Sequence, residues 1–464
     1  MPLSIPRPDF AEINEPLKVA AASANQYLST VTERRVSPSE EAVRGLSRFH
    51  ETLPETKTNP REVIELLHEV GSPATVASTG GRYFGFVIGG SLPAVTAASW
   101  LASAWDQNAA LRVMSPVAAE LEDVLLGWLR ELLGLPKDSD GGLVTCATAA
   151  NFTALVAARS ALLALDGWNV EEDGLFGAPP IQVIVGEEVH ASMEKALGLA
   201  GFGKKRVTIV PADSQGRMRA EKLPKISERS IVCIQAGNVN TGAFDFAEEI
   251  CARAHEAGAW VHVDGAFGLW AGVSPQYCKL TKGFERADSW ATDAHKWLNV
   301  SYDSGIVMVR DAMALRRAMT ISAAYLEPGA KREPMNRVPD ASRRARGIEL
   351  WAALKSLGRT GVSELVERTC KLASRFAGKL KAAGYTILND VVINQVLVTF
   401  GSASKTREVI RQVQEEGTCW CGGTVWHGSA AMRISVSSWV TTEEDIDRSA
   451  DAVIRIAMGI GESH

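Results

Sequence analysis

The apolar positions between residues 143 and 309 follow two alternating patterns. Short runs of β-branched residues, apolar on both sides, are separated by stretches with helical spacing. Such runs are typical of central strands in a mostly parallel sheet, and their alternation with helices predicts a doubly wound α/β domain. In this architecture the functional site lies at the carboxyl ends of the strands. Strands are predicted at 181–185, 207–210, 231–234, 260–263 and 305–309, and a helix at 248–257.

The pattern changes on either side of this region. Residues 1–60 are helical with polar breaks, and Ser and two acids at 37–41 favour a helix start. After residue 346 a long helix is predicted to continue to 382. Strands at 391–400 and 432–438 follow, and Thr442 opens a last helix. We therefore expect an N-terminal helical segment at 1–110, a large domain at 111–345 and a smaller C-terminal α+β domain at 346–464. The N-terminal segment lacks a dense apolar face, so it is expected to lie over a partner subunit or the large domain.

Composition and charge narrow the class of protein. The chain has 464 residues, of which 46% are hydrophobic, and a formal net charge of −5. This balance favours neither nucleic acid nor an anionic membrane as a partner, and no apolar run approaches the ~20 residues that span a bilayer. Seven irregularly spaced Cys and the absence of a signal-peptide pattern predict reduced thiols in the cytoplasm. The Cys419–Cys421 pair has no second pair at zinc-finger spacing, so no metal site is predicted.

The segment Thr292–Leu298 (TDAHKWL) carries the chemistry. Lys296 directly follows a His just behind a strand-like run, and Asp264 ends an apolar strand 32 residues earlier (296 − 264). A buried carboxylate needs a cationic or donor partner. A lysine that forms a Schiff base and a buried acid are the two fixed points that hold pyridoxal phosphate (PLP). The lysine captures the aldehyde, and the acid keeps the ring nitrogen protonated so that the ring accepts electrons. The alternative reading of Lys296 is an ordinary residue at the end of a strand.

Several ordered motifs between about Arg82 and Thr442 resemble the group II PLP-dependent amino-acid decarboxylases, which belong to the fold type I PLP enzymes. The resemblance implies a PLP-dependent transferase-like large domain, PLP as cofactor, an amino-acid substrate and a homodimer. It also implies roles for four residues in the two motifs above. These are Lys296 as the imine lysine, Asp264 as the partner of the ring nitrogen, Ala266 as the small residue beneath the ring and His295 as a phosphate contact.

Two further motifs resemble the walls of the family's cofactor site. His190 stands at a helix start after a strand, where the family's imidazole stacks on the ring; a polar surface His is the alternative. The turn at 144–151 matches the family's phosphate-binding turn, in which helix N-terminal amides bind the anion. Here Cys146 and Ala147 replace glycines and Ala149 replaces an acid. The phosphate role therefore falls to backbone amides, including that of Ala147, and to the Thr148 hydroxyl.

Two positions depart from the family's pattern. Asn238 stands where a Thr is commoner, and it either touches the ring or the imine or only forms a turn. Asp293 stands where many relatives carry an Asn that donates to the phosphate. An ionised Asp would repel phosphate, so we expect Asp293 to point away or to bind backbone amides.

A Tyr on a mobile loop is a further feature of these decarboxylases. Tyr325 lies 29 residues after Lys296 (325 − 296), on a segment whose prolines, glycine and charges are typical of a lid. In the family this Tyr is thought to protonate the carbanion left by CO2. Arg332 and Glu333, on the same segment, are expected to be solvated. The basic run 343–346 is either a solvated or ion-paired helix start or part of the site.

Substrate recognition rests on fewer residues. The segment 82–88 resembles an aromatic pocket wall that Trp105 would join, with core packing as the alternative. Arg433 either pairs with a carboxylate or bridges two domains. We expect decarboxylation of an L-amino acid with an aromatic or large apolar side chain, with Lys296, Tyr325 and His190 as catalytic residues. The alternatives are a PLP-dependent carbon–carbon lyase like sphingosine phosphate lyase, an oxidative variant that forms an aldehyde, and a non-catalytic PLP-binding protein.

Overall fold

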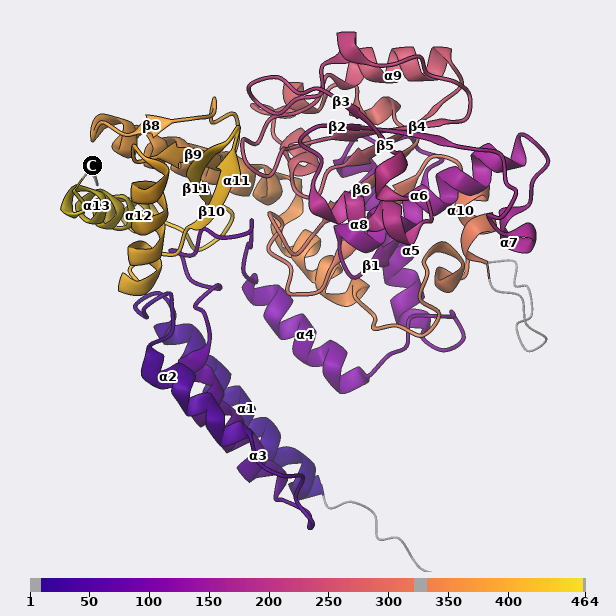
Figure 1. The fold of residues 1–464 in the computed structure, drawn as a ribbon. Coiled ribbons are helices and arrows are strands. Elements are labelled where there is room, and N and C mark those ends of the chain that lie inside the picture. Colours follow the sequence, from indigo (N-terminus) through magenta and orange to yellow (C-terminus); the bar gives the residue numbers. More distant parts are fainter. Residues whose placement is uncertain (1–9, 321–331, 462–464) are drawn as a thin grey trace, which may run out of the picture.

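The computed structural model describes residues 10–320 and 332–461. Two β-sheets, each with its own helices, stand side by side, and a helical arm extends away from them (Figure 1). The larger sheet contains seven strands in the order β1-β7-β6-β5-β4-β2-β3. Its strands are β1 (Asp140–Val144), β2 (Gln182–Gly186), β3 (Thr208–Val210), β4 (Ser230–Gln235), β5 (Trp260–Asp264), β6 (Ser289–Asp293) and β7 (Gly305–Val309).

The large sheet is mostly parallel, as predicted. β2, β3, β4, β5 and β6 pair in parallel, whereas β7 is antiparallel to both β6 and β1. The five predicted strands lie within one residue of their expected bounds. No bounds were predicted for β1 and β6, which contain Asp-Gly-Gly and Ser-Trp-Ala-Thr-Asp. These sequences lack the β-branched runs that identify a strand, although both strands are almost wholly buried.

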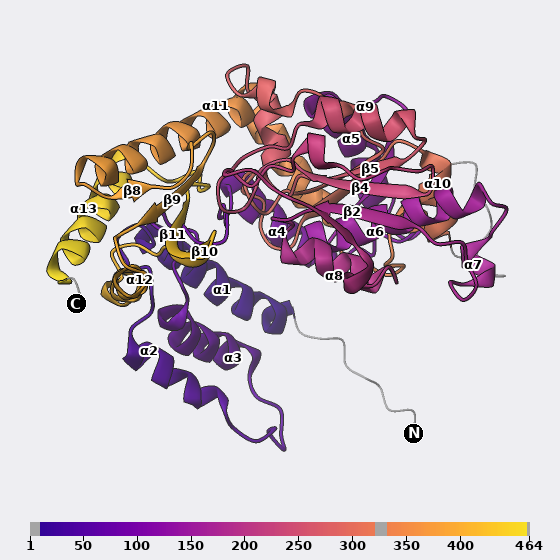
Figure 2. The same ribbon diagram turned by 45° about the horizontal axis from the view of Figure 1, so that its top comes forward.

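Helices cover both faces of this sheet (Figure 2). Side chains alternate between two cores: Val183 and Val185 face one, and Ile184 faces the other. On the first face lie α6 (Ala147–Ala164), α8 (Ala191–Leu199) and α10 (Ala312–Met319). On the second lie α5 (Pro116–Leu132) and α9 (Ala247–Glu256). The short α7 (Val170–Asp173) follows α6.

α6 is apolar around most of its circumference because the sheet, α8 and α10 all pack against it. Within the part of the chain that the structure describes, it is the one helix long and apolar enough to cross a membrane by length and composition, and 67% of that stretch is buried inside the protein. Its composition therefore reflects its place in the core.

The smaller sheet is antiparallel, in the order β10-β11-β9-β8. Its strands are β8 (Thr386–Ile387), β9 (Gln395–Thr399), β10 (Gly422–Trp426) and β11 (Ser429–Ser435), and it packs with α12 (Ala403–Glu416) and α13 (Glu443–Gly459). The strand predicted at 391–400 is shorter than expected because Val391 has a φ of +48°, in the left-handed region, which a strand does not allow. The predicted start of the last helix is confirmed, since Thr442 caps α13.

One long helix, α11 (Gly347–Ala382), connects the two sheets (Figure 2). Its first half contributes Leu350 and Leu354 to the large core, and its second half contributes Phe376 and Leu380 to the small one. The helix is interrupted at Gly358, whose φ of +60° is one that side-chain-bearing residues rarely adopt. Its two halves are therefore two helical segments joined at a glycine.

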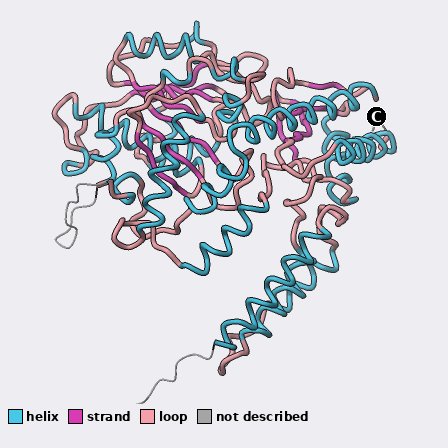
Figure 3. Tube along the Cα trace, turned by 180° about the vertical axis from the view of Figure 1, so that it is seen from behind, coloured by secondary structure: helices cyan, strands magenta, loops and turns pink. Residues whose placement is uncertain are grey.

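The N-terminal segment begins with α1 (Phe10–Thr30), α2 (Glu40–Gly45) and α3 (Pro60–Leu66), which extend away from both sheets (Figures 1 and 3). The predicted helix start at 37–41 is confirmed, because Ser39 caps α2. α4 (Pro93–Trp105) then leads into the large sheet's layer of helices. The arm does not lie over the large sheet, which was one of the two positions expected for it.

A buried carboxylate organises the basic residues that follow the loop. Glu122 of α5 is 2% exposed and accepts hydrogen bonds from Arg332 at 2.9 Å and Arg343 at 2.7 Å. Arg332 also contacts Asp140 at 3.2 Å, and Glu333 accepts the backbone N–H of Arg112 at 2.7 Å. The expectation that Arg332 and Glu333 are solvated was wrong, because acids on α5 and β1 bind Arg332 and a backbone N–H binds Glu333.

The other members of the basic run also form ion pairs. Arg346 contacts Asp303 at 2.6 Å, and Arg344 contacts Glu349. The run at 343–346 is thus an ion-paired helix start, which was one of the two readings left open by the sequence.

Replacing Arg343 by Ala should lower the free energy of unfolding by about 3 kcal/mol or more, because Glu122 would lose one of two cations while staying buried. Arg359→Ala is the matched control. Its partner Glu131 is exposed, so the change should stay below about 1 kcal/mol. Urea unfolding followed by circular dichroism measures both, and equal effects would contradict the role given to Glu122.

Candidate active site

The carboxyl ends of five strands bring the predicted residues to one edge of the large sheet. Asp264 ends β5, and Lys296 follows β6 by three residues. The turn after β1 begins α6, Asn238 follows β4, and His190 precedes α8 after β2. Because β5 and β6 are adjacent and parallel, the acid and the lysine leave the same edge from neighbouring strands.

Asp264 points toward α6. The pleat of β5 places Trp260, His262 and Asp264 on one face. Asp264 is 6% exposed and accepts hydrogen bonds from Asn151 Nδ2 and from the backbone N–H of Ala266, both at 3.2 Å. Among the described residues, no cation pairs with it. Its partners within the chain are therefore neutral donors.

Asn151 is itself held by an imidazole. The Asn151 side-chain oxygen lies 2.9 Å from His262 Nε2, and the other nitrogen of that ring lies 2.9 Å from the Ser289 hydroxyl. Burial lowers the pKa of His262 to about 4, so the ring is neutral at pH 7. Since Asn151 donates to Asp264 through its nitrogen, its oxygen accepts from the ring. This chain fixes the direction in which the Asp264 carboxylate points.

Lys296 is paired with Asp293, the last residue of β6. Its Nζ lies 3.3 Å from Asp293 Oδ2, and the side chain of Asp293 is 2% exposed. The other oxygen of Asp293 accepts the backbone N–H of Ala147 at 2.6 Å. Asp293 thus binds a backbone amide, as expected from the sequence, and that amide is the first of α6.

His295 lies beside the same acid. Its Nε2 is 3.6 Å from Asp293 Oδ2, its Nδ1 accepts the backbone N–H of Ser304 at 3.0 Å, and its ring stacks on Tyr302 at 4.3 Å. Burial lowers the pKa of His295, although the Asp293 charge opposes the shift. The ring is therefore a neutral imidazole with its proton on Nε2.

The N-terminus of α6 faces this group. Cys146 is the N-cap residue and its side chain makes no capping hydrogen bond, so the first amides of the helix depend on other partners. Ala147 is buried, and Thr148, next in the first turn, is partly exposed. Gly305 of β7 packs directly behind, where a Cβ would lie 2.6 Å from the Cys146 Cα. The turn is therefore held tightly against β7.

His190 connects the acid and the lysine electrostatically. It caps α8, and its Nδ1 accepts the backbone N–H of Ser192 at 3.2 Å. Its side chain is exposed, but desolvation by the surrounding protein lowers its pKa. The charge of Asp264 opposes this shift, whereas that of Lys296 adds to it. All three residues lie at or just after the carboxyl ends of strands β2, β5 and β6, and they therefore lie at the same edge of the sheet.

Asn238 forms a turn. Its side-chain oxygen accepts the backbone N–H groups of Asn240 at 2.9 Å and Thr241 at 3.2 Å, and its nitrogen donates to Gln235 at 3.2 Å. Its amide is engaged at both ends and is 2% exposed. The geometry therefore favours the turn-forming reading over direct contact with a cofactor.

The aromatic segment 82–88 divides between core and surface. Phe84 packs edge-on against Phe376 in the small core, which is the packing alternative. Tyr83 stacks on Trp420 at 5.2 Å, and Phe86, 57% exposed, lies 5.4 Å from the same indole. Trp105 ends α4 and is 46% exposed. Phe86 is thus the residue of this segment that is open to a ligand.

Sequence reasoning missed two residues that position the site. Asn151 lies at the end of the turn at 144–151 but was given no predicted role, and Asn299 was not predicted to belong to the site. Asn299 donates to the Ser437 carbonyl at 2.9 Å and accepts the backbone N–H of Trp439 at 2.9 Å, which ties the lysine loop to the small domain. Its φ of +58° is a conformation that Asn adopts more readily than most residues. Tyr325, the predicted lid residue, lies outside the described residues.

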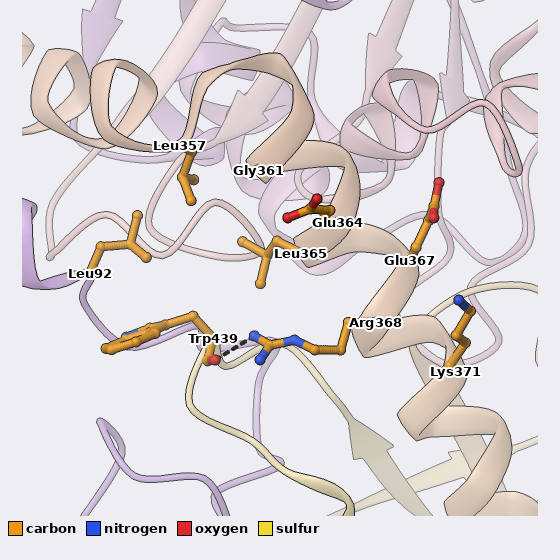
Figure 4. Close-up of a pocket in the computed structure, with 9 residues that line it drawn as sticks. All are labelled: Leu92, Leu357, Gly361, Glu364, Leu365, Glu367, Arg368, Lys371 and Trp439. Carbon is orange, nitrogen blue, oxygen red and sulfur yellow. Dashed lines mark hydrogen bonds between the residues drawn. The ribbon is translucent and has the colours of Figure 1, made fainter.

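A pocket of about 500 Å³ lies beside α11, with Leu92 and Trp439 among its walls (Figure 4). The guanidinium of Arg368 donates to the Trp439 carbonyl across this pocket. The lining of this pocket includes neither the lysine nor the acid of the site, so the pocket does not lie over the reactive groups.

The residues present fit PLP. A buried carboxylate with only neutral donors matches a protonated ring nitrogen, and Lys296 lies one strand away. Within the described part of the chain, the hydroxyl of Ser304, whose backbone N–H binds His295, is buried and has no hydrogen-bond partner. Lys296, Asp264 and the start of α6 would hold the linking carbon, the ring nitrogen and the phosphate of this cofactor respectively.

Comparisons with known proteins agree with this chemistry. The pyridoxal-dependent decarboxylase conserved domain matches residues 48–401. The chain is 24% identical to an aromatic-L-amino-acid decarboxylase of Bacillus atrophaeus over 86% of each chain. It is 29% identical to a histidine decarboxylase of Drosophila melanogaster over 72% of this chain and 42% of that one.

Solved structures share the fold. Oryza sativa TDC, solved with PLP and tryptamine, superposes with a TM-score of 0.89 at 21% identity and covers 99% of both chains. Mouse CSAD superposes with a TM-score of 0.88 at 20% identity over 97% of this chain and 99% of that one. From the domain match and the site together, the chain belongs to the pyridoxal-dependent decarboxylase family of PLP-dependent carboxy-lyases.

Proposed function

We propose that this protein decarboxylates an L-amino acid with an aromatic or large apolar side chain, releasing the amine and CO2. The observation that carries the proposal is the meeting of Lys296, Asp264 and His190 at one sheet edge. When bound, PLP supplies an aldehyde that links to amines and a ring that accepts the electrons freed when CO2 leaves. Relatives named as histidine and aromatic-amino-acid decarboxylases support the substrate class.

Each residue has a defined task. Asp264, oriented by Asn151, holds the proton on the ring nitrogen, because the buried carboxylate is stabilised by a positive charge. Lys296 would hold the cofactor's aldehyde carbon through its amine. His190, held by the backbone N–H of Ser192, is proposed to contact the ring of the cofactor. Tyr325 is proposed to return a proton to the substrate carbon.

The substrate side of the site combines apolar surface with one cation. Phe86 provides exposed aromatic surface, and the partly buried Trp420 packs against it. Arg433 of β11 adds a positive charge that acts on His190, and burial lowers its pKa. Within the described residues it makes no ion pair; its contact is the side-chain oxygen of Asn240 at 3.4 Å. Arg433 is therefore proposed to pair with the substrate's carboxylate.

We also propose a homodimer in the cytoplasm. A groove of about 940 Å³ lies between the arm and α4, and its lining is predominantly apolar. The surrounding arm and α4 region exposes several large apolar side chains, namely Leu17, Leu67, Trp100, Leu101, Trp105 and Val113. A second subunit would cover this surface, in keeping with the homodimer that the resemblance implies. All seven Cys are free, which suits a reducing compartment.

The substrate class is tested by incubating the PLP-loaded protein with a panel of L-amino acids and measuring CO2 and amine. We expect turnover of aromatic or large apolar substrates and little of small or acidic ones. Aldehyde production from a phosphorylated amino alcohol without CO2 would instead support the carbon–carbon lyase. Absence of every product would support a non-catalytic protein.

Replacing Lys296 by Ala should abolish the visible absorbance of the protein-linked cofactor and reduce activity to background, because among the described residues Lys296 is the amine paired with Asp293 at this site. Lys195→Ala, on the exposed side of α8, is the matched control and should retain both. Absorbance spectra after gel filtration decide the outcome, and an unchanged spectrum for the Lys296 variant would reject the assignment.

Replacing Tyr325 by Phe should shift the products from amine toward aldehyde and ammonia, because the substrate carbon would lose its proton donor. Products are quantified by chromatography after the same incubation. Amine formation at the unaltered rate would show that Tyr325 is not the donor.

A further inference from the structure

The carboxylate of Asp293 occupies the place where the cofactor's phosphate is expected to bind. Its Oδ1 lies 2.6 Å from the Ala147 N–H, the first amide of α6. Its Oδ2 lies 3.3 Å from Lys296 Nζ, the amine to which the cofactor is linked. Both ends of this carboxylate are therefore engaged with groups that the cofactor also needs.

The packing keeps Asp293 at this place. Its backbone N–H donates to the Ala266 carbonyl at 2.9 Å, and its own carbonyl accepts from Trp270 Nε1 at 3.1 Å. Asp293 is the last residue of β6, where it pairs with Gly305 of β7, and its side chain is 2% exposed. The turn before α6 cannot move away from Asp293, because Gly305 packs against the backbone of Cys146. Asp293 therefore remains beside the helix start when a phosphate arrives.

The charges at this place change when the cofactor binds. In the free protein the Lys296 ammonium offsets the Asp293 carboxylate. A phosphate bound at the start of α6 would add up to about two negative charges, which the single ammonium of Lys296 does not offset as well. Two anions would then share a site with little solvent. Two negative charges in contact repel each other, and this repulsion favours the uptake of a proton by one of the two groups.

Among the titratable groups packed around Asp293, none is a better place for this proton, which leaves Asp293 and the phosphate itself. His295 cannot take the proton without losing the hydrogen bond from Ser304 to its Nδ1. Tyr302 is already protonated, since burial raises its pKa to about 12. Asp303 is paired with Arg346 at 2.6 Å. The remaining titratable groups around it are Cys146 before α6, His190 before α8, Asp264 on β5 and Lys296 itself.

We propose that Asp293 is protonated while the cofactor's phosphate is bound and that it then donates a hydrogen bond to a phosphate oxygen. A neutral carboxyl has the size and the donor of an Asn amide, so it would take the role of the Asn that many relatives carry at this position. One proton passes from solvent to the carboxylate, and no covalent bond changes. Cofactor affinity should therefore fall as the pH rises. The proposal rests on PLP as cofactor and does not depend on the substrate.

Pyridoxine 5′-phosphate is the probe, because it has the ring and the phosphate but no aldehyde to react with Lys296. The full-length protein, freed of cofactor, is titrated calorimetrically in Hepes and in Tris, whose different ionisation enthalpies report the protons taken up. The unaltered protein should take up about one proton more than Asp293→Asn. Between about pH 7 and 8 its dissociation constant should rise about tenfold relative to that of the variant.

Asp288→Asn is the matched control. Asp288 also faces a His, with its carboxylate 3.0 Å from His255 Nε2, but it precedes β6 at the opposite edge of the sheet. This variant should behave like the unaltered protein. Equal proton uptake by the unaltered protein and Asp293→Asn would overturn the proposal.

A second measurement uses the unaltered protein alone and remains decisive if Asp293→Asn does not fold. The infrared difference spectrum on binding the probe should show the C=O band of a newly protonated carboxyl. Its absence would overturn the proposal. Neither measurement involves a substrate, so a failure of the proposed decarboxylation, seen as missing CO2, is distinguishable from a failure here.

Discussion

A buried carboxylate without a cation of its own is the constraint on which this site depends. Asp264 is almost fully buried and is held by an amide and a backbone N–H, neither of which carries a charge. Ionisation in such a place is costly unless a positive charge lies opposite. A protonated pyridine ring provides that charge, and the carboxylate in turn keeps the ring protonated. The acid and the cofactor therefore stabilise each other's charged forms.

The rest of the large domain serves to aim this carboxylate and to bring an amine to it. β5 and β6 are neighbours, so the acid and the lysine leave the sheet together. Asn151 of α6, which is itself held by the neutral His262 of β5, orients the acid. On the lysine side, Asp293 holds the amine and the start of α6 at once. The site is thus a set of short loops fixed to rigid strands, which preserves its geometry.

Contacts from distant parts of the chain hold the lysine loop in place. Asn299 binds the Ser437 carbonyl and the Trp439 N–H of the small domain, and its own carbonyl accepts the N–H of Leu92. Gly89 passes so close behind the loop that a Cβ there would lie 2.0 Å from the Lys296 carbonyl oxygen. A side chain at residue 89 would displace the loop. The small domain and the segment before α4 are therefore parts of the active site's support.

The amino-acid sequence by itself determined the kind of fold and the principal chemistry. Apolar runs predicted five of the seven strands of the large sheet, and the acid at the end of one strand with the lysine behind another predicted the cofactor. These are local patterns, readable from neighbouring residues. The tertiary structure alone decided which side chains meet across the sheet. In the folded protein Arg332 binds Glu122, and the side chain of Asn238 binds backbone amides within its own turn. The carboxylate of Asp293 accepts the first N–H of α6. Such pairings join residues more than a hundred positions apart or depend on how tightly a turn closes. Spacing along the chain does not encode them, because they follow from how strands and helices pack.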